Sequence, residues 1–169
     1  MLQNRKLKYL LPTFLMIGVF AFARKKNKMK LNNIVPFQKI RGCDGSGCGY
    51  YGASRKKRIH KGIDIITNFG EQVFSPISGK VRTLFVYYGS TEMKGVEIKD
   101  GNLSVKMFYV NPNNIITTND YVFAGALIGY AQDIAAYHNA TGIMTQHVHV
   151  EIRQNGVLVD PTLYFNINK

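Results

Sequence analysis

Short runs of β-branched and aromatic residues alternate with turn-forming residues along most of the chain. From residue 60 onward these runs are bounded by Gly, Asn, Asp or Pro, a pattern that predicts β-strands. The motif KDGN at residues 99–102 separates two of the runs and predicts a hairpin turn. We expect strands over residues 62–66, 72–77, 79–88, 95–99, 103–110, 125–131, 147–153 and 157–160.

No window beyond the N-terminus shows a helical period of apolar residues. The expected fold class is therefore all-β, with antiparallel strands in a sandwich or a partly open barrel. With 169 residues, the chain has room for one domain of ordinary size and a terminal segment.

The first 30 residues have a charge pattern of their own. A cationic head precedes an apolar run of 14 residues, LLPTFLMIGVFAFA, and the cations RKKNKMK follow it. This run predicts a hydrophobic helix and fits a secretory signal peptide, because a membrane span needs about 20 apolar residues. The cations after the run favour instead an uncleaved anchor that contacts the membrane through residues 9–23. Signal peptide, anchor and orientation all stay open.

The net charge of +12 is concentrated at the N-terminus. Residues 1–30 hold eight of the 22 basic residues and none of the ten acidic residues, so the rest of the chain carries only +4. A mildly basic body without a nucleic-acid-binding motif argues against nucleic acid as a partner. Five of the remaining cations form one run around a histidine: Arg55, Lys56, Lys57, Arg58 and Lys61.

The two cysteines, Cys43 and Cys48, lie in the motif CDGSGC. Four intervening residues permit a disulfide-closed loop, which is typical of extracytoplasmic proteins. Half of a four-ligand zinc site is a competing interpretation, but no second cysteine pair exists to complete it. We predict a disulfide, with free thiols as the alternative.

The strongest candidate chemistry lies in two histidine motifs. His147 and His149 are two residues apart on an expected strand, so both rings project from the same face of the sheet. His60 and Asp64 also share a face, but full extension would separate their Cα atoms by about 13 Å. We therefore predict that the chain bends at Gly62, where the missing side chain also leaves space for a metal ion.

Together, these motifs contain two histidines and one aspartate that could hold zinc with one coordination position free for water. Zinc lowers the pKa of such a water, which yields a hydroxide nucleophile, and the remaining histidine of the pair is placed as a general base. Each motif alone also fits ordinary surface histidines. Their combination favours the metal site.

The chain resembles the lysostaphin-type zinc metallopeptidases over roughly residues 40–165. HKGIDI resembles that family's first ligand motif and HVHVEI resembles the second. VFSPISGKV, AGALIGYA and NGVLVDPTLYF follow the family's order. The resemblance implies a twisted antiparallel sheet with a groove, zinc ligands at His60, Asp64 and His149, and a catalytic histidine at His147. It also implies cleavage of peptides in bacterial peptidoglycan.

The charge pattern and the resemblance together divide the chain into four expected parts. Residues 1–30 are the signal peptide or anchor with its basic flank, and residues 31–41 are a linker or a first extended segment. Residues 42–165 are the peptidase-like domain, and residues 166–169 are a tail.

One position departs from the family pattern. Active members carry a further histidine in a tyrosine-x-histidine-leucine motif, where this chain has Tyr109 in VKMFYVNP. In this respect, the chain resembles the leukocyte cell-derived chemotaxin branch of the family, whose members are secreted signalling ligands. The Tyr109 hydroxyl could still donate a hydrogen bond to an oxyanion, or the ring could simply pack in the groove. His138 could approach the site from its loop, or it could be an ordinary surface histidine.

Two functions therefore compete. The first is a zinc peptidase that acts on peptidoglycan or another anionic envelope polymer, with the basic run at the rim of its groove. The second is a zinc-stabilised module that binds a wall peptide or a protein partner without cutting it. The basic run could also be a solvated loop.

Overall fold

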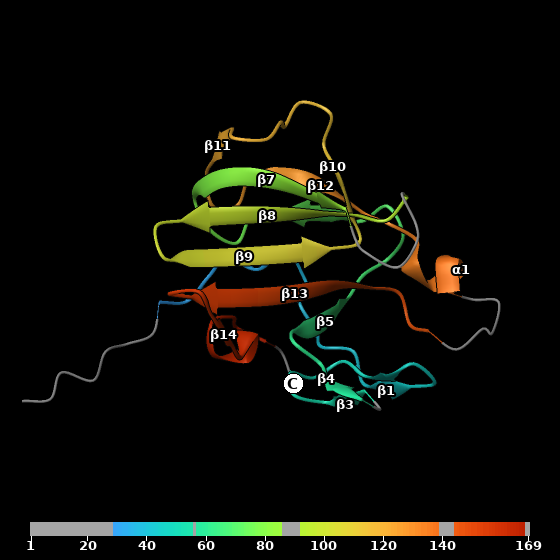
Figure 1. Ribbon diagram of the computed structural model, residues 1–169. Helices are drawn as coiled ribbons and strands as arrows, with labels where there is room; N and C mark the ends of the chain where they lie inside the picture. The colour runs from blue at the N-terminus through green and yellow to red at the C-terminus, as the bar shows by residue number, and fades with distance from the viewer. Residues whose placement is uncertain (1–28, 56, 86–91, 139–143, 168–169) are drawn as a thin grey trace, which may run out of the picture.

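Two antiparallel sheets of unequal size form the body of the protein (Figure 1). The computed structural model describes residues 29–55, 57–85, 92–138 and 144–167. The all-β fold class expected from the strand pattern is confirmed. The expected N-terminal hydrophobic helix lies outside the described residues. Within these residues, no helix has the length and apolarity to cross a membrane.

The larger sheet has seven strands, and β13 (His147–Gln154) is its hub. On one side β13 pairs with β9, and on the other side its first half pairs with β5 and its second half with β14. Beyond β9 the sheet continues through β8 and β7 to β11. The bounds are β5 (Ile63–Ile66), β7 (Gly79–Phe85), β8 (Lys94–Asp100), β9 (Leu103–Phe108), β11 (Tyr121–Val122) and β14 (Val157–Val159).

The smaller sheet has three strands in the order β10 (Val110–Pro112), β12 (Leu127–Ala131) and β6 (Gln72–Phe74). One core lies between the two sheets, with Val96 and Val150 from the larger sheet and Val73 and Ile128 from the smaller. The residues expected as a linker or first extended segment also contribute Leu31, Ile34 and Val35 to this core.

Tyr109 marks the point where the chain passes from the larger sheet to the smaller. The sequence predicts one strand over residues 103–110, but Tyr109 has a φ of 66° and divides it into β9 and β10. Its N–H donates to the Lys94 carbonyl at 2.8 Å, and its own carbonyl accepts from the Gln132 N–H at 2.8 Å. A bulky residue rarely adopts this left-handed conformation, so the chain turns here at a cost in backbone energy.

The remaining elements are small. Two two-stranded ribbons precede β5: β1 (Cys43–Asp44) with β2 (Gly47–Cys48), and β3 (Ser54–Arg55) with β4 (Arg58–Ile59). A one-turn helix, α1 (Ile134–His138), and a 3-10 helix (Pro161–Leu163) complete the described fold. The predicted hairpin at KDGN is confirmed, since Asp100 pairs with Leu103 across the turn between β8 and β9.

The predicted bend at Gly62 is confirmed, and the structure gives its physical reason. A Cβ atom at Gly62 would lie 2.1 Å from the Val150 carbonyl oxygen and 2.9 Å from Cε1 of the His149 ring. The segment before β5 therefore passes against the backbone of β13 with no room for a side chain. This contact sets how closely His60 approaches β13.

Gly62→Ala is expected to destabilise the protein by about 1–3 kcal/mol, because either β13 or the bend must move to accept the methyl group. Gly42→Ala is the matched control, since a Cβ there meets nothing within 4 Å. The measurement is urea-induced unfolding of both variants with the disulfide intact. Equal stability of Gly62→Ala and wild type would show that the close approach is unimportant.

Candidate metal centre

The pairing of β5 with β13 brings the two predicted motifs together. Asp64 lies directly opposite His149 in this ladder, and His60 reaches the same point through the bend at Gly62. Asp64 Oδ1 lies 2.8 Å from His149 Nδ1 and 3.1 Å from His60 Nε2. The two ring nitrogens are 2.9 Å apart. Three donor atoms from distant parts of the sequence thus converge on one point.

The outer nitrogen of each ring is fixed by a backbone or carboxylate oxygen. His60 Nδ1 lies 2.8 Å from the Tyr50 carbonyl oxygen, which can only accept a hydrogen bond, so Nδ1 carries the proton and Nε2 keeps its lone pair. His149 Nε2 lies 3.5 Å from Glu151 Oε1, and its Nδ1 faces Asp64. Such outer partners are typical of histidines that ligate metals.

His147 is oriented by the same kind of contact. Its Nδ1 lies 2.7 Å from the Thr145 carbonyl oxygen and therefore donates to it. The lone pair of Nε2 then lies on the side of Asp64, 3.7 Å from Oδ1. The expectation that His147 and His149 share a face is confirmed, since both rings line one cavity. His147 stands beside the three donor atoms and outside their cluster.

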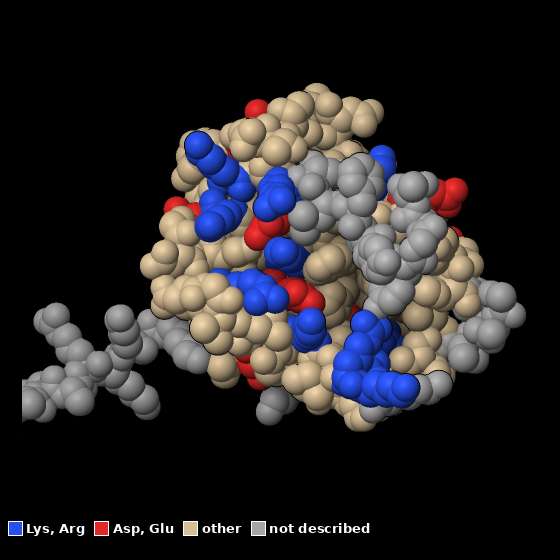
Figure 2. Space-filling view, viewed as in Figure 1, with Lys and Arg blue, Asp and Glu red and all other residues tan. Residues whose placement is uncertain are grey.

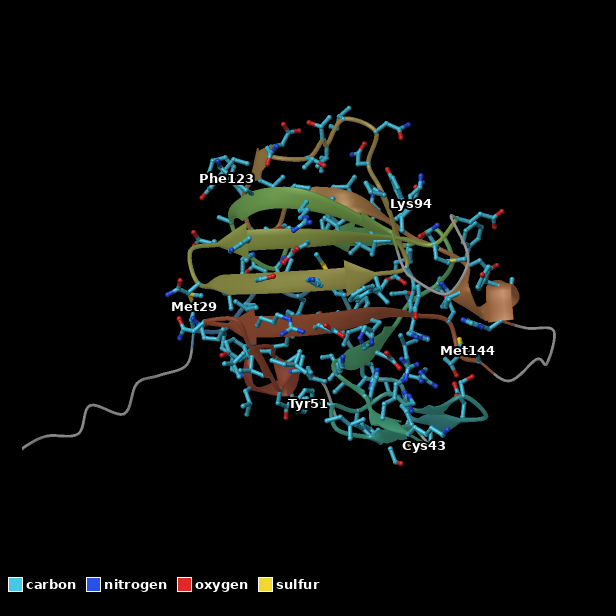
Figure 3. All side chains as sticks on the ribbon, viewed as in Figure 1. Met29, Cys43, Tyr51, Lys94, Phe123 and Met144 are labelled. Carbon is cyan, nitrogen blue, oxygen red and sulfur yellow. A yellow bond between two sulfur atoms is a disulfide. The ribbon has the colours of Figure 1, made fainter. Side chains whose placement is uncertain are left out.

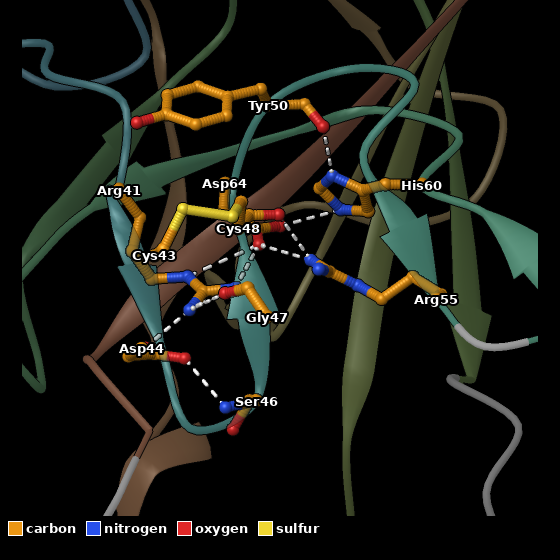
Figure 4. The surroundings of a disulfide bond; sticks show 10 residues. All are labelled: Arg41, Cys43, Asp44, Ser46, Gly47, Cys48, Tyr50, Arg55, His60 and Asp64. Carbon is orange, nitrogen blue, oxygen red and sulfur yellow. Dashed lines mark hydrogen bonds and ion pairs between the residues drawn. A yellow bond between two sulfur atoms is a disulfide. The ribbon is translucent and has the colours of Figure 1, made fainter.

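Two arginines bind the second oxygen of Asp64 (Figure 4). Arg41 donates to Oδ2 from Nη2 at 2.7 Å and from Nε at 3.3 Å. Arg55 Nη2 lies 3.6 Å from the same oxygen. Arg41 is only 2% exposed. The two carboxylate oxygens therefore have different partners: Oδ2 faces the arginines and Oδ1 faces the histidines.

The loop closed by Cys43 and Cys48 holds these two arginines. The predicted disulfide is confirmed. The Gly47 carbonyl accepts from Arg41 Nη1 at 2.9 Å, and the Cys48 carbonyl accepts from Arg55 Nη2 at 2.6 Å (Figure 4). Asp44, within the loop, forms an ion pair with Arg41. The loop therefore fixes both guanidinium groups on the far side of Asp64.

Sequence reasoning missed the role of Arg41. Arg55 was predicted only as part of a basic rim, whereas it reaches inward to Asp64. The local signal for Arg41 is weak, since its only nearby feature is an acid three residues later. Its main partner lies 23 residues away. Nothing in residues 39–44 alone predicts that contact.

The electrostatics keep Asp64 ionised and His147 neutral. Burial alone would raise the pKa of Asp64, but the hydrogen bond from His149 holds it well below its usual range. Burial lowers the pKa of His147, and Asp64 offsets this only in part. Burial would also lower the pKa of His149, but Asp64 and Glu151 raise it above its usual value. At neutral pH, His147 is therefore able to accept a proton.

A cavity of about 590 Å³ lies over this cluster. Tyr109 lines it, with its ring edge-on to His147 at a centroid distance of 5.5 Å. His138 at the end of α1 lines it too, together with Met144, labelled in Figure 3. Of the predicted basic rim, Arg58 and Lys61 line the cavity beside Arg55. Lys57 is exposed and is not part of the lining, and Lys56 lies outside the described residues.

The donor set fits zinc. Two imidazole nitrogens and one carboxylate oxygen are ligands that zinc takes at about 2.0–2.2 Å, and tetrahedral ligands at that distance lie roughly 3.3 Å apart. The observed separations of 2.8, 2.9 and 3.1 Å approach this value. Among the described residues, His60, Asp64 and His149 form a group whose ligand atoms lie close enough together to hold a metal ion. Metal ligation also agrees with the hydrogen bond that fixes the outer nitrogen of His60 and with the free side of Asp64 Oδ1, which faces the histidines.

Comparison with known proteins places the chain in a family. Residues 58–161 match the model of peptidase family M23. Leukocyte cell-derived chemotaxin-2 of Bos taurus is 34% identical over 127 residues, which are 74% of this chain and 78% of that protein.

Two solved structures share the fold. The catalytic domain of lysostaphin, described as an antimicrobial peptidase from Staphylococcus simulans, superposes with a TM-score of 0.50 at 25% identity, over 70% of this chain and 88% of that domain. Csd3 of Helicobacter pylori gives a TM-score of 0.60 at 22% identity, over 84% of this chain and 36% of that one. The resemblance stated from the two histidine motifs is confirmed: this chain belongs to peptidase family M23, the lysostaphin-type peptidases.

Proposed function

We propose that this protein is a zinc-dependent peptidase that acts on peptides of the bacterial cell wall, outside the cytoplasm. The observation that carries the proposal is the position of His147. Its Nε2 lies 3.7 Å from the carboxylate oxygen on which the three candidate ligands converge. Residues 1–30 would serve as the signal peptide or membrane anchor that brings the domain to this compartment.

His60 Nε2, Asp64 Oδ1 and His149 Nδ1 would hold the zinc ion. Bound there, zinc supplies Lewis acidity and lowers the pKa of a water molecule toward neutrality. Arg41 and Arg55 stabilise the ionised Asp64 from its other side. Glu151 stabilises positive charge on the outer nitrogen of His149. These contacts keep the donor atoms in place before the metal binds.

His147 acts as the general base. The Thr145 carbonyl fixes the Nδ1 proton of His147, so its Nε2 can accept a proton from the attacking water. Burial lowers the pKa of His147, so the ring is neutral near pH 7. The protonated ring then returns the proton to the leaving amine. Asp64 stabilises the cationic form of His147 through the short separation of the two groups.

Tyr109 lies where it can support the same step. The edge-on contact with His147 places its ring in the cavity wall. We assign its hydroxyl to the oxyanion that forms when water attacks the peptide carbonyl. Its left-handed backbone conformation is strained, and strained residues often lie at functional sites.

The charge of the cavity favours an anionic peptide. Arg58 and Lys61 line its opening, while Glu151 is engaged by His149. A cationic entrance concentrates ligands that carry carboxylates. Peptidoglycan stem peptides carry such groups, and lysostaphin, which shares the fold, is an antimicrobial peptidase.

A second candidate function is a zinc-stabilised binding module that does not cleave its ligand. The observation in its favour is Tyr109, which stands where active family members have a histidine. The similarity to leukocyte cell-derived chemotaxin-2 points the same way. In that case the ligand would be a wall peptide or a protein partner.

The peptidase proposal predicts that the zinc-loaded protein releases soluble peptide fragments from purified cell-wall sacculi. His147→Ala should abolish the release, because this variant lacks the ring that accepts the proton of the attacking water. Tyr109→Phe should reduce the rate about 100-fold if its hydroxyl donates to the oxyanion. Fragment release is measured by chromatography with mass spectrometry.

Tyr109→His separates the two candidate functions. Histidine adopts left-handed backbone more readily than most residues, so this variant should fold. If wild type releases nothing from several wall types while Tyr109→His does, the natural protein is a binding module. If neither protein cleaves but both bind zinc, the peptidase proposal is wrong.

A separate prediction concerns Arg41. Arg41→Met leaves the buried Asp64 carboxylate with a weaker cationic partner, so zinc affinity should fall about 10- to 100-fold. Isothermal titration calorimetry with zinc measures this change. Lys39→Met removes an exposed cation two residues away and should leave the affinity unchanged. Equal affinities of all three proteins would contradict a role for Arg41 in positioning Asp64.

A further inference from the structure

The open face of the larger sheet carries its charged residues in rows that cross the strands. Next to the metal centre, Glu151, Lys106, Glu97 and Arg82 are successive register partners on β13, β9, β8 and β7. Their charges alternate in sign, which stabilises cross-strand pairs. Lys106 lies 3.9 Å from Glu97, and the Ser104 hydroxyl also donates to Glu97. This row is internally compensated.

The next row along the strands is cationic. Arg153, Ser104, Lys99 and Lys80 are register partners across the same four strands. Lys99 and Lys80 lie directly opposite each other, an arrangement of like charges that destabilises a sheet. Among the described residues, none of these three cations forms an ion pair. This row therefore carries three cations and no acid.

A second cavity of about 220 Å³ lies over these residues. Lys99, Lys106 and Arg153 line it, with Glu97 as its acid. Two hairpin turns frame the cavity, and they are tied together because the Asn155 N–H donates to the Asn102 carbonyl at 2.8 Å. Arg153 donates to the Gly156 carbonyl at 3.2 Å, which holds its guanidinium group at the edge of the cavity.

One cross-strand pair connects the linings of the two cavities. Glu151 lines the cavity over the metal centre, and its register partner Lys106 lines the second. Basic and acidic side chains interleave across the middle of this face (Figure 2). Along β13, Arg153 lies four positions after His149, a distance of about 13 Å. An extended peptide that lies parallel to β13 on this face would span the same distance in about four residues.

We propose that the second cavity is an anion subsite, which binds a carboxylate on the peptide that occupies the metal centre, about four residues from the atom at the metal. This inference rests on the proposed function and adds a specificity determinant to it. Glu97 is already engaged by Ser104 and Lys106, so Lys99 and Arg153 remain for the ligand. A guanidinium group beside an ammonium group suits a carboxylate.

The test uses peptides with a hydroxamate, a zinc-binding group, at one end. Extended glycine peptides carry one glutamate four residues from the hydroxamate, and matched peptides carry glutamine there. Both chain directions are made, because the groove does not fix the direction. With the zinc-loaded protein, the better glutamate peptide should bind about tenfold more tightly than its glutamine partner.

Lys99→Gln/Arg153→Gln should reduce this ratio to about one and leave binding of the glutamine peptide unchanged. Lys39→Gln makes the same kind of charge change at an exposed position that lines neither cavity, and it should keep the ratio. Equal binding of the glutamate and glutamine peptides in both directions would overturn the proposal. So would a tenfold ratio that survives in the double variant.

A second measurement tests the subsite in the absence of the metal. Without a hydroxamate, an acetylated glutamyl peptide should shift the amide NMR signals of Gly101, Asn102, Asn155 and Gly156 in the metal-free protein, and the glutaminyl peptide should not. If these signals shift but the protein does not bind zinc, the proposed function is wrong and the subsite stands. If the glutamyl peptide shifts none of these signals, the peptide-carboxylate subsite is wrong, whether or not inorganic phosphate shifts them.

Discussion

The buried carboxylate of Asp64 is the group on which the arrangement of the site depends. A charged side chain that is 2% exposed is unstable unless cations and hydrogen-bond donors surround it. Arg41 and Arg55 meet Oδ2, while His60 and His149 meet Oδ1. Removing one partner of such a buried ion pair typically costs about 3–5 kcal/mol. The two arginines compensate the charge of the carboxylate permanently, whereas the two histidines present donor atoms beside it.

The irregular parts of the fold follow from this requirement. The disulfide-closed loop supplies the Gly47 and Cys48 carbonyls that orient the two arginines. The bend at Gly62 lets His60 pass against β13 without a clash. The ladder between β5 and β13 puts Asp64 opposite His149. The site lies on the regular strands β5 and β13, and the less regular segment 41–62 contributes the charged and ligating side chains around it. Such a division is typical of sites built on a sheet and completed by loops.

Sequence patterns predict most of the sheet and the two histidine motifs, because both depend on spacing within short segments, and the family resemblance then implies which residues ligate the metal. The even spacing in HVHVEI puts two rings on one face, and the HxxxD motif requires a bend that Gly62 permits. The Arg41–Asp64 pair could not be predicted, since it joins segments 23 residues apart. The break at Tyr109 was also missed, because a run of strand-forming residues gives no sign of a single left-handed residue. The cationic row of Lys80, Lys99 and Arg153 exists only once the register of four strands is known.

The central claim is that His60, Asp64 and His149 together hold one zinc ion. A crystal structure of the zinc-loaded protein, with anomalous diffraction data collected at the zinc edge, tests it most directly. We expect one strong anomalous peak within about 2.2 Å of His60 Nε2, Asp64 Oδ1 and His149 Nδ1. His147 Nε2 should lie outside the ligand shell but within hydrogen-bond reach of its open position. A peak ligated by His147 instead of His149, or no peak at this cluster, would contradict the account.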